Sequence, residues 1–364
     1  MYGFNSKKVK DNANKLIAAF NKQLELKEKK GNQFEISNDS KEISWSRALR
    51  NRFNKSKQLI DKCERTKNVM YRPFTKKYLA DYSDLIETPS MWKNILFDGC
   101  SNNNIISVSG IVNYGEFSVL VSDITQDLQV IKNCTCLPLY YSDKSNDNTI
   151  FNYMNTQSNN LNITESIIKK FQKVYKDDKI IGEDIFAYIY ALLHNEEYRL
   201  KYGNYIYKDM PRIPFVKEIK QYINIGKKLI DLHINYEKEI DYKKLGIVLD
   251  ISKEDFKVSK MRFSKTQDGK EDKTIIVYND FVTIKNIPIE AYNYIVNRKP
   301  AIEWIMDQYR IKEDKETGII DNPNEYEPNN EKYILNLLLS VINVSLETLR
   351  LIKGMPKYEE IAIN

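Results

Sequence analysis

One short stretch of the sequence, VMYRPFTKKYLA, combines three cations with aromatic rings and a proline. Arg72, Lys76 and Lys77 can neutralise phosphate groups and donate hydrogen bonds to their oxygens, which positions a nucleic acid on a protein. We predict that these three side chains face a nucleic acid, while Tyr71 and Phe74 anchor the segment in the core and the proline fixes its path. The alternative is that Arg72 makes a structural salt bridge and the two lysines are solvated.

A second group of cations lies on a helix that the sequence EISWSRALRNRFNKSKQ predicts. Trp45, Leu49 and Phe53 recur every four residues and therefore share one face of this helix. The cations occupy much of the remaining surface, where we predict phosphate contacts; they are Arg47, Arg50, Arg52 and Lys55. Plain solvent exposure, or docking against a domain that this chain lacks, would explain the same pattern.

A third group of cations, Lys260, Arg262 and Lys265, lies in the sequence KMRFSKTQDGKEDK. Because side chains alternate along a strand, Lys260 and Arg262 share one face, and Met261 and Phe263 share the other. Arginine can donate to both acceptors on the major-groove edge of guanine, so Arg262 is the predicted base contact. A purely structural hairpin is the alternative.

The charge of the chain is distributed unevenly. The net charge is +6, but residues 1–80 hold 20 Lys and Arg against 8 Asp and Glu, so the rest of the chain is acidic. A basic segment of this kind favours a polyanionic partner, of which DNA and RNA are the commonest. A lysine-rich composition with solvated faces is the alternative.

The motifs of several enzyme classes are absent. The sequence contains no GxGxxG or GxxxxGK[ST] loop to hold phosphates, and no NPPY-type loop to hold a flipped adenine, since residues 322–326 read NPNEY. Asp314, Asp321 and Glu325 lie in polar sequence, and we expect them to be solvated. We therefore predict that this chain catalyses no reaction by itself and needs no cofactor.

Metal sites and membrane spans are also not predicted. Cys134 and Cys136 form a CxC pair without a second pair of ligands nearby, which argues against structural zinc. Both histidines, His194 and His233, lie in helical patterns, and we expect His194 and Arg199 to satisfy carbonyls at a helix end. No run of eighteen apolar residues and no apolar signal core is present, so we expect a cytoplasmic protein without a membrane span.

Helical and strand patterns alternate in blocks, which favours an α+β fold over a doubly wound sheet. Residues 104–140 and 247–284 are rich in β-branched and aromatic residues and predict strands. Apolar residues at helical spacing predict helices elsewhere, over 6–30, 164–175, 183–202, 216–233, 288–309 and 331–352. We divide the chain into a basic helical segment, a strand-rich part, a helical part, and a last part with strand hairpins and C-terminal helices, with bounds 1–80, 81–150, 151–240 and 241–364.

Several segments resemble a known family in the same order along the chain. VMYRPFTKKYL resembles the YRPF segment that follows the methyltransferase domain of Type ISP restriction-modification enzymes, which are single-polypeptide relatives of Type I systems. SWSRALRNRFNKSKQ resembles the basic helix before it, and the segment ending in Cys136, Pro138, Leu139 and Tyr140 resembles the strand block of the family. EDIFAYIYALLHNEEYRLKYGNYIYKDMPRIPF is the most specific similarity, and the likeness extends over about residues 40–356.

The resemblance implies a target recognition region that selects double-stranded DNA for other domains of a longer enzyme. In the family those domains are a nuclease, a helicase-like ATPase and an adenine-N6 methyltransferase that uses S-adenosylmethionine, and their motifs are absent here. The expected partners are therefore DNA and these domains, without a membrane. Two other functions stay open. The chain could be a protein-interaction module whose basic segment, residues 1–80, docks on a partner domain, or a truncated S-adenosylmethionine-dependent methyltransferase.

Overall fold

A computed structural model describes residues 1–59, 62–86, 103–109, 117–141, 160–206 and 209–362. The helices are α1 (Ser6–Lys30), α2 (Arg47–Asn54), α4 (Glu165–Tyr175), α5 (Gly182–His194), α6 (Glu196–Ile206), α7 (Ile219–Ile234), α8 (Ala301–Gln308) and α9 (Tyr333–Lys353). The strands are β1 (Tyr2–Gly3), β2 (Thr66–Arg72), β3 (Thr75–Ala80), β4 (Ile105–Val108), β5 (Val119–Ser122), β6 (Thr135–Pro138), β7 (Tyr140–Tyr141), β8 (Asn160–Leu161), β9 (Val248–Ile251), β10 (Arg262–Lys265), β11 (Glu271–Val277), β12 (Val282–Lys285), β13 (Ile295–Val296), β14 (Lys299–Pro300), β15 (Lys312–Glu313) and β16 (Ile320–Asp321).

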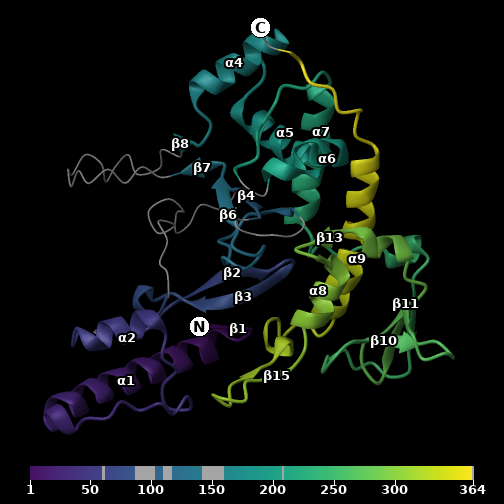
Figure 1. Cartoon of the computed structure of the whole chain (residues 1–364). Helices are drawn as coiled ribbons and strands as arrows, with labels where there is room; N and C mark the ends of the chain where they lie inside the picture. The colour runs from purple at the N-terminus through teal and green to yellow at the C-terminus, as the bar shows by residue number, and fades with distance from the viewer. Residues whose placement is uncertain (60–61, 87–102, 110–116, 142–159, 207–208, 363–364) are drawn as a thin grey trace.

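Small antiparallel sheets and separate helices make up the molecule (Figure 1), so the predicted α+β class is confirmed. The sheets have the strand orders β1-β3-β2, β5-β4-β6 and β10-β11-β12-β9, and the remaining strands form two-stranded pairs. The N-terminal segment is helical through α1 and α2, but residues 66–80 form the β2–β3 hairpin instead of continuing the helical pattern. The predicted connector at 142–160 lies almost wholly outside the described residues.

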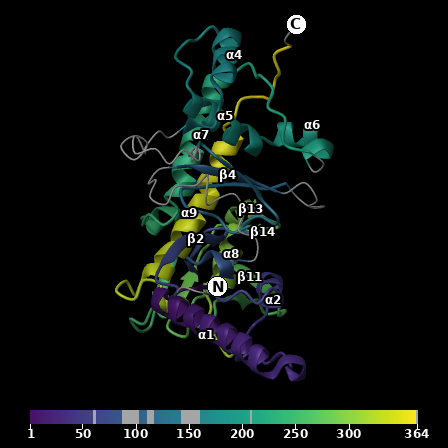
Figure 2. The same ribbon diagram turned by 90° about the vertical axis from the view of Figure 1, so that its left-hand side faces the viewer.

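Helix α1 covers the β1-β3-β2 sheet at the N-terminal end of the molecule (Figures 1 and 2). Asn5 caps it by accepting a 3.0 Å hydrogen bond from the backbone N–H of Lys8, and Gly31 ends it at φ 51°, a conformation that glycine adopts without strain. A row of apolar residues at helical spacing faces inward with helix α2, and its members are Val9, Ala13, Ile17, Phe20 and Leu24. Together they form a separate small core.

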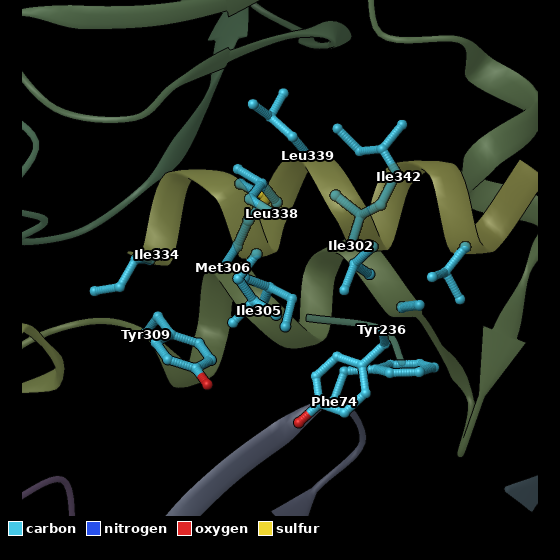
Figure 3. Packing of buried hydrophobic residues seen from close by; sticks show 14 of the residues in the cluster. Phe74, Tyr236, Ile302, Ile305, Met306, Tyr309, Ile334, Leu338, Leu339 and Ile342 are labelled. Atoms are coloured by element: carbon cyan, nitrogen blue, oxygen red, sulfur yellow. The ribbon is translucent and has the colours of Figure 1, made fainter. Parts of the chain in front are cut away.

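Helix α9 passes through the molecule and contributes to both larger cores (Figures 2 and 3). Its first half packs with α8 and the β10-β11-β12-β9 sheet, whereas Leu351 near its end packs with α5, α7 and the β5-β4-β6 sheet. Among the described helices, α9 is long and apolar enough to cross a membrane by length and composition alone. Its apolarity is explained by burial inside the protein, which covers 67% of the tested window.

A buried hydrogen-bond chain joins the two larger cores around His233. The backbone N–H of Val121 donates to the Tyr190 hydroxyl, whose own proton then goes to Nδ1 of His233 at 2.5 Å. Nε2 of His233 therefore carries the ring proton and donates to the Thr348 hydroxyl at 2.8 Å, and Thr348 donates onward to the Val344 carbonyl. The neutral imidazole is thus satisfied on both sides, whereas a second ring proton at Nδ1 would displace the proton that Tyr190 donates there.

This arrangement predicts a specific loss of stability in acid. Burial lowers the pKa of His233 to about 3, from about 6.5 in an unfolded chain. Between these values the unfolded state binds a proton that the folded state does not, so the free energy of unfolding falls as the pH drops from about 6.5 toward about 3, by at most about 1.4 kcal/mol per pH unit. Urea unfolding midpoints at about pH 7 and about pH 5 measure this loss. We expect His233→Gln to reduce it, and an undiminished loss in that variant would contradict the assignment.

His194 is the last residue of α5, and Arg199 lies in the next helix, α6, because the single helix predicted over 183–202 is divided at Asn195. Nδ1 of His194 is 2.9 Å from the carbonyl oxygen of Tyr190, and Nε of Arg199 donates to the Leu193 carbonyl at 2.6 Å. Arg199 thus satisfies a carbonyl that the end of α5 leaves without an intrahelical partner, while the ring of His194 bonds a carbonyl one turn earlier, so the predicted structural role is confirmed.

Candidate nucleic-acid interface

The β2–β3 hairpin explains the mixture of rings, cations and a proline in VMYRPFTKKYLA. Arg72 pairs with Thr75, so Pro73 and Phe74 form a two-residue turn. Pro73 has its backbone φ set by its ring, and Phe74 takes the left-handed value of 55°. Only 1% of Phe74 is exposed, and its ring lies 5.2 Å from that of Tyr236. The turn therefore inserts a phenylalanine into the core in a backbone conformation that costs about 1–2 kcal/mol.

The three cations of this hairpin bind carboxylates from three distant segments. Arg72 donates to Asp127 at 3.0 Å, and its guanidinium lies 4.0 Å from the centre of the Tyr71 ring. The side chains of Arg72 and Lys76 are 22% and 15% exposed, and Lys76 pairs with a glutamate of the helical part, Glu237, at 2.5 Å.

Lys77 is the most enclosed of the three cations. Its side chain is 6% exposed and pairs with Asp321 of strand β16. The prediction that these cations face a nucleic acid is therefore wrong for Lys77, and Arg72 and Lys76 are mostly covered as well. The structural salt bridge considered for Arg72 is present, and it extends to both lysines, which are not solvated. Asp321 itself is not a solvated loop residue, because it also accepts from the backbone N–H of Phe4 at 3.2 Å.

Helix α2 presents cations on the surface, as predicted. Ser46 caps the helix by accepting from the backbone N–H of Leu49 at 3.1 Å, and Leu49 and Phe53 are buried against α1. The side chain of Arg52 pairs with Asp84 at 3.0 Å and donates to the Gln58 carbonyl. The exposed cations of this helix, which we call the α2 cations, are Arg47, Arg50 and Lys55.

Strand β10 presents a second set of exposed cations. Met261 is 3% exposed while Arg262 is exposed, so the predicted alternation of side chains is confirmed at these two positions. The pairing with β11 is irregular between Phe263 and Ser264, because three residues of β11 at this point have no partner residue in β10. The exposed cations at this strand, which we call the β10 cations, are Lys260, Arg262 and Lys265.

The tertiary structure keeps the α2 cations and the β10 cations apart. Figure 1 shows α2 and α1 at the left of the lower half of the molecule and the β10–β11 hairpin at the right, with strand β15 between them. The ten predicted contact residues therefore form no single patch. The β2–β3 cations are mostly or wholly covered, Arg52 is partly covered, and the other six cations are in two exposed groups.

A row of lysines on α1 was not among the predicted contact residues. Lys8, Lys15, Lys22 and Lys29 recur every seven residues and are all exposed. Since seven residues make almost two helical turns, these lysines lie along one face of the helix. The heptad spacing was visible in the sequence and would have identified this surface.

The part of the chain that the structure describes holds a small polar cavity and no cluster of metal-ligating side chains. Among the described residues, no group of three or more His, Cys, Asp or Glu side chains is placed to hold a metal ion. A cavity of about 130 Å³ near the start of α9 is lined by polar residues that include Lys257, Glu327 and Glu331. Pockets for nucleotide-sized molecules have volumes of about 300–1,000 Å³, so this cavity is too small for a nucleoside cofactor.

Comparisons with known proteins agree with the resemblance in the sequence. Residues 1–337 match the family described as the Type ISP C-terminal specificity domain. The structure of a nuclease-deletion mutant of the Type ISP restriction-modification enzyme LlaGI, in complex with a DNA substrate mimic, is similar with a TM-score of 0.83 and 36% identity over 99% of this chain. The ATP-dependent Type ISP restriction-modification enzyme LlaBIII bound to DNA is similar with a TM-score of 0.83 and 34% identity over 99% of this chain.

A third similar structure is a complex of DrdV with DNA, with a TM-score of 0.82 and 25% identity over 98% of this chain. The chain spans only 32%, 22% and 34% of the LlaGI, LlaBIII and DrdV chains, respectively. No curated protein sequence matches the chain.

Proposed function

Because this chain belongs to the Type ISP C-terminal specificity domain family, we propose that it recognises a DNA target sequence on behalf of a restriction-modification enzyme. The observation that carries the proposal is the similarity of nearly the whole chain to three structures that contain DNA. The exposed cations on α2 and β10 support it, because cations at the protein surface can reach phosphates and base edges.

We assign different tasks to the two groups of cations. The α2 cations lie on a helix whose other face is buried, and they contact phosphates in any DNA sequence. Lys15 and Lys29 of the α1 row extend this surface, whereas Lys8 and Lys22 pair with Glu325 and Glu42. Arg262 lies on a strand next to the buried Met261, which fixes the backbone that carries it. A fixed arginine can read guanine through two hydrogen bonds, so Arg262 is the proposed base contact.

Binding of the chain to a random-sequence duplex pool tests the proposal. The pool is incubated with the chain at moderate salt, and the retained duplexes are sequenced. Enrichment of one asymmetric motif is the expected result and would identify the target. If duplexes are retained without enrichment of any motif, the chain binds phosphates but does not select a sequence. Failure to retain any duplex at low salt would contradict DNA contact by this chain.

Neutralising the α2 cations should weaken the binding of every duplex to a similar degree. We expect the triple variant Arg47→Gln, Arg50→Gln, Lys55→Gln to reduce the dependence of log Kd on log salt by about 1 for each phosphate contact that is lost. Fluorescence anisotropy with a labelled duplex at several salt concentrations measures this slope. The matched control replaces three exposed lysines on or next to α4, Lys169, Lys173 and Lys176, with glutamine. An equal loss in both triple variants would remove α2 from the interface.

The variant Arg262→Gln should change specificity more than general affinity. We expect a loss of about 1–3 kcal/mol for the preferred duplex and relaxed selection at a single base pair, because one guanine loses its bidentate partner. Repeating the pool selection with the variant measures the change. Lys265→Gln, at the other end of β10, is the control, and it should leave the selected motif unchanged. An unchanged motif with Arg262→Gln would exclude this residue as a reader.

We further propose that this chain supplies no catalytic group and no cofactor, and that adenine-N6 methylation and DNA cleavage belong to other domains of a longer cytoplasmic enzyme. The missing adenine-holding loop and phosphate-binding motifs support this assignment. Calorimetric titration with S-adenosylmethionine tests it, and we expect no detectable heat of binding. Saturable binding would favour a truncated methyltransferase.

Docking of a partner domain on the basic segment, residues 1–80, is the second candidate function. The asymmetric charge of the chain favours it as well. The salt dependence of duplex binding separates the two. Phosphate contacts release counterions and give a steep slope, whereas a chain whose cations are reserved for a protein partner would show weak duplex binding with a shallow slope.

A further inference from the structure

A pair of thiols lies at the edge of the β5-β4-β6 sheet, where no part of the proposed interface uses it. The Sγ atoms of Cys134 and Cys136 are 3.7 Å apart. Cys136 is in strand β6 and pairs with Ser107 of β4, while Cys134 directly precedes the strand. Residues two apart on an extended chain point to the same side, but their Cβ atoms are about 6–7 Å apart. The two side chains therefore lean toward each other.

The surroundings hold the two sulfur atoms in place. The Ser107 hydroxyl lies 3.2 Å from Sγ of Cys136, and the S–H of Cys134 is 3.6 Å from the Asp127 carbonyl. The backbone N–H of Cys134 donates to the Leu128 carbonyl at 3.0 Å, which closes the loop before it. Cys134 is 7% exposed, whereas Cys136 is partly open to solvent. A small oxidant can therefore reach the pair through Cys136.

The two thiols differ in acidity. The pKa of the Cys134 thiol is lowered, chiefly because the S–H of Cys136 donates to its sulfur. The pKa of Cys136 is raised by the same contact and by burial. A thiolate is the reactive form of cysteine, and a neighbouring thiol can then resolve an oxidised sulfur.

We propose that Cys134 and Cys136 form an oxidation site that closes to an intramolecular disulfide when it reacts with a hydroperoxide. The Cys134 thiolate attacks the peroxide, the O–O bond breaks, and Cys134 becomes a sulfenic acid. The leaving alkoxide (or hydroxide) takes up the proton that the Cys134 thiol had released and departs as an alcohol (or water). The Cys136 thiol then attacks Sγ of Cys134, the S–O bond breaks, and the hydroxyl leaves as water with the proton of Cys136. Two thiols are oxidised and one hydroperoxide is reduced.

The separation of the sulfur atoms makes this closure accessible. A disulfide needs an S–S distance of about 2.0 Å, so the two sulfur atoms must approach by less than 2 Å. The ring that closes between residues two apart is small and strained, and strained disulfides are readily reduced by thiols. The modification is therefore reversible. The same pair, as two thiols within reach of one atom, can also chelate a trivalent arsenical.

Treatment of the full chain with hydrogen peroxide, followed by blocking of free thiols and peptide mapping, tests the proposal. The expected result is a peptide that contains both Cys134 and Cys136, has lost two hydrogens, and regains two free thiols with a dithiol reductant. The variant Cys63→Ser, Cys100→Ser should react in the same way, because neither of these cysteines takes part. Separate addition of oxygen to the two cysteines without loss of hydrogens, or no reaction at either, would overturn the proposal.

A second measurement does not depend on an oxidant. We expect the chain to retain one equivalent of phenylarsine oxide on gel filtration, and to lose that retention in both Cys134→Ser and Cys136→Ser. Far-ultraviolet circular dichroism checks that the two variants are folded. If they are not, the peptide map of the chain with its own cysteines after peroxide treatment still tests the proposal. Retention of the arsenical by either single variant would show that the two thiols do not act together.

Discussion

Replacing Phe74 by alanine should lower the free energy of unfolding by about 3–5 kcal/mol, the range for a fully buried aromatic residue. The ring lies between segments that are far apart in the sequence, 5.2 Å from Tyr236 and 6.3 Å from Tyr294. Figure 3 shows it pointing from the hairpin toward helices α8 and α9. Its removal leaves a cavity where the N-terminal hairpin meets the C-terminal core, because alanine retains the backbone but none of the ring contacts. Urea unfolding measures the loss.

Two further variants separate the ring from the backbone strain. Phe74→Gly removes the same ring and also relieves the left-handed conformation, so we expect it to be no less stable than Phe74→Ala, although glycine is the more flexible residue. Leu200→Ala removes an equally apolar side chain that is 85% exposed, and we expect a change within about 0.5 kcal/mol. A loss of less than about 1 kcal/mol for Phe74→Ala would show that the ring does not hold the hairpin to the core.

Replacing Asp321 by alanine should destabilise the protein by about 3–5 kcal/mol, because it leaves the buried ammonium of Lys77 without its carboxylate. Lys77 is enclosed by the rings of Phe4 and Tyr71, whose centres lie 4.4 and 4.6 Å from its nitrogen. These rings attract the cation but offer no charge to replace Asp321. Thermal and urea unfolding at neutral pH measure the effect.

The charge explanation is tested by removing both partners of the pair. The double variant Lys77→Met, Asp321→Leu leaves no buried charge, and we expect it to be more stable than Asp321→Ala alone. Glu325→Ala is the matched control, since its partner Lys8 is 55% exposed and such pairs contribute about 0–1 kcal/mol. If the double variant were as unstable as Asp321→Ala, lost packing rather than unpaired charge would be the cause.

The sequence predicted elements well where local patterns decide structure. The apolar spacing on α1 and α7 specifies which face of each helix is buried, and the β-branched run of β4 predicts a strand, whose four residues are all buried. The structure has these elements close to the predicted ranges. The alternation around Arg262 was also readable, because a strand with one buried face fixes the orientation of each side chain. The apolar face of the α2 helix was local in the same sense.

The partners of the charged residues were beyond what local patterns can predict. Arg72 meets Asp127, and Lys76 meets a glutamate more than one hundred residues away. A cation on a strand looks the same in the sequence whether it faces solvent or a carboxylate from another element. The carboxylate is brought there only when the sheets and helices pack.

The sequence by itself determined the class of the fold, the family and the elements that carry the exposed cations, because periodicity, motif order and charge density are properties of neighbouring residues. The tertiary structure alone decided which cations remain on the surface. It buried Lys77 against Asp321 and left Arg262 exposed, because burial depends on the packing of segments hundreds of residues apart, and a charge is enclosed only where that packing supplies an opposite one.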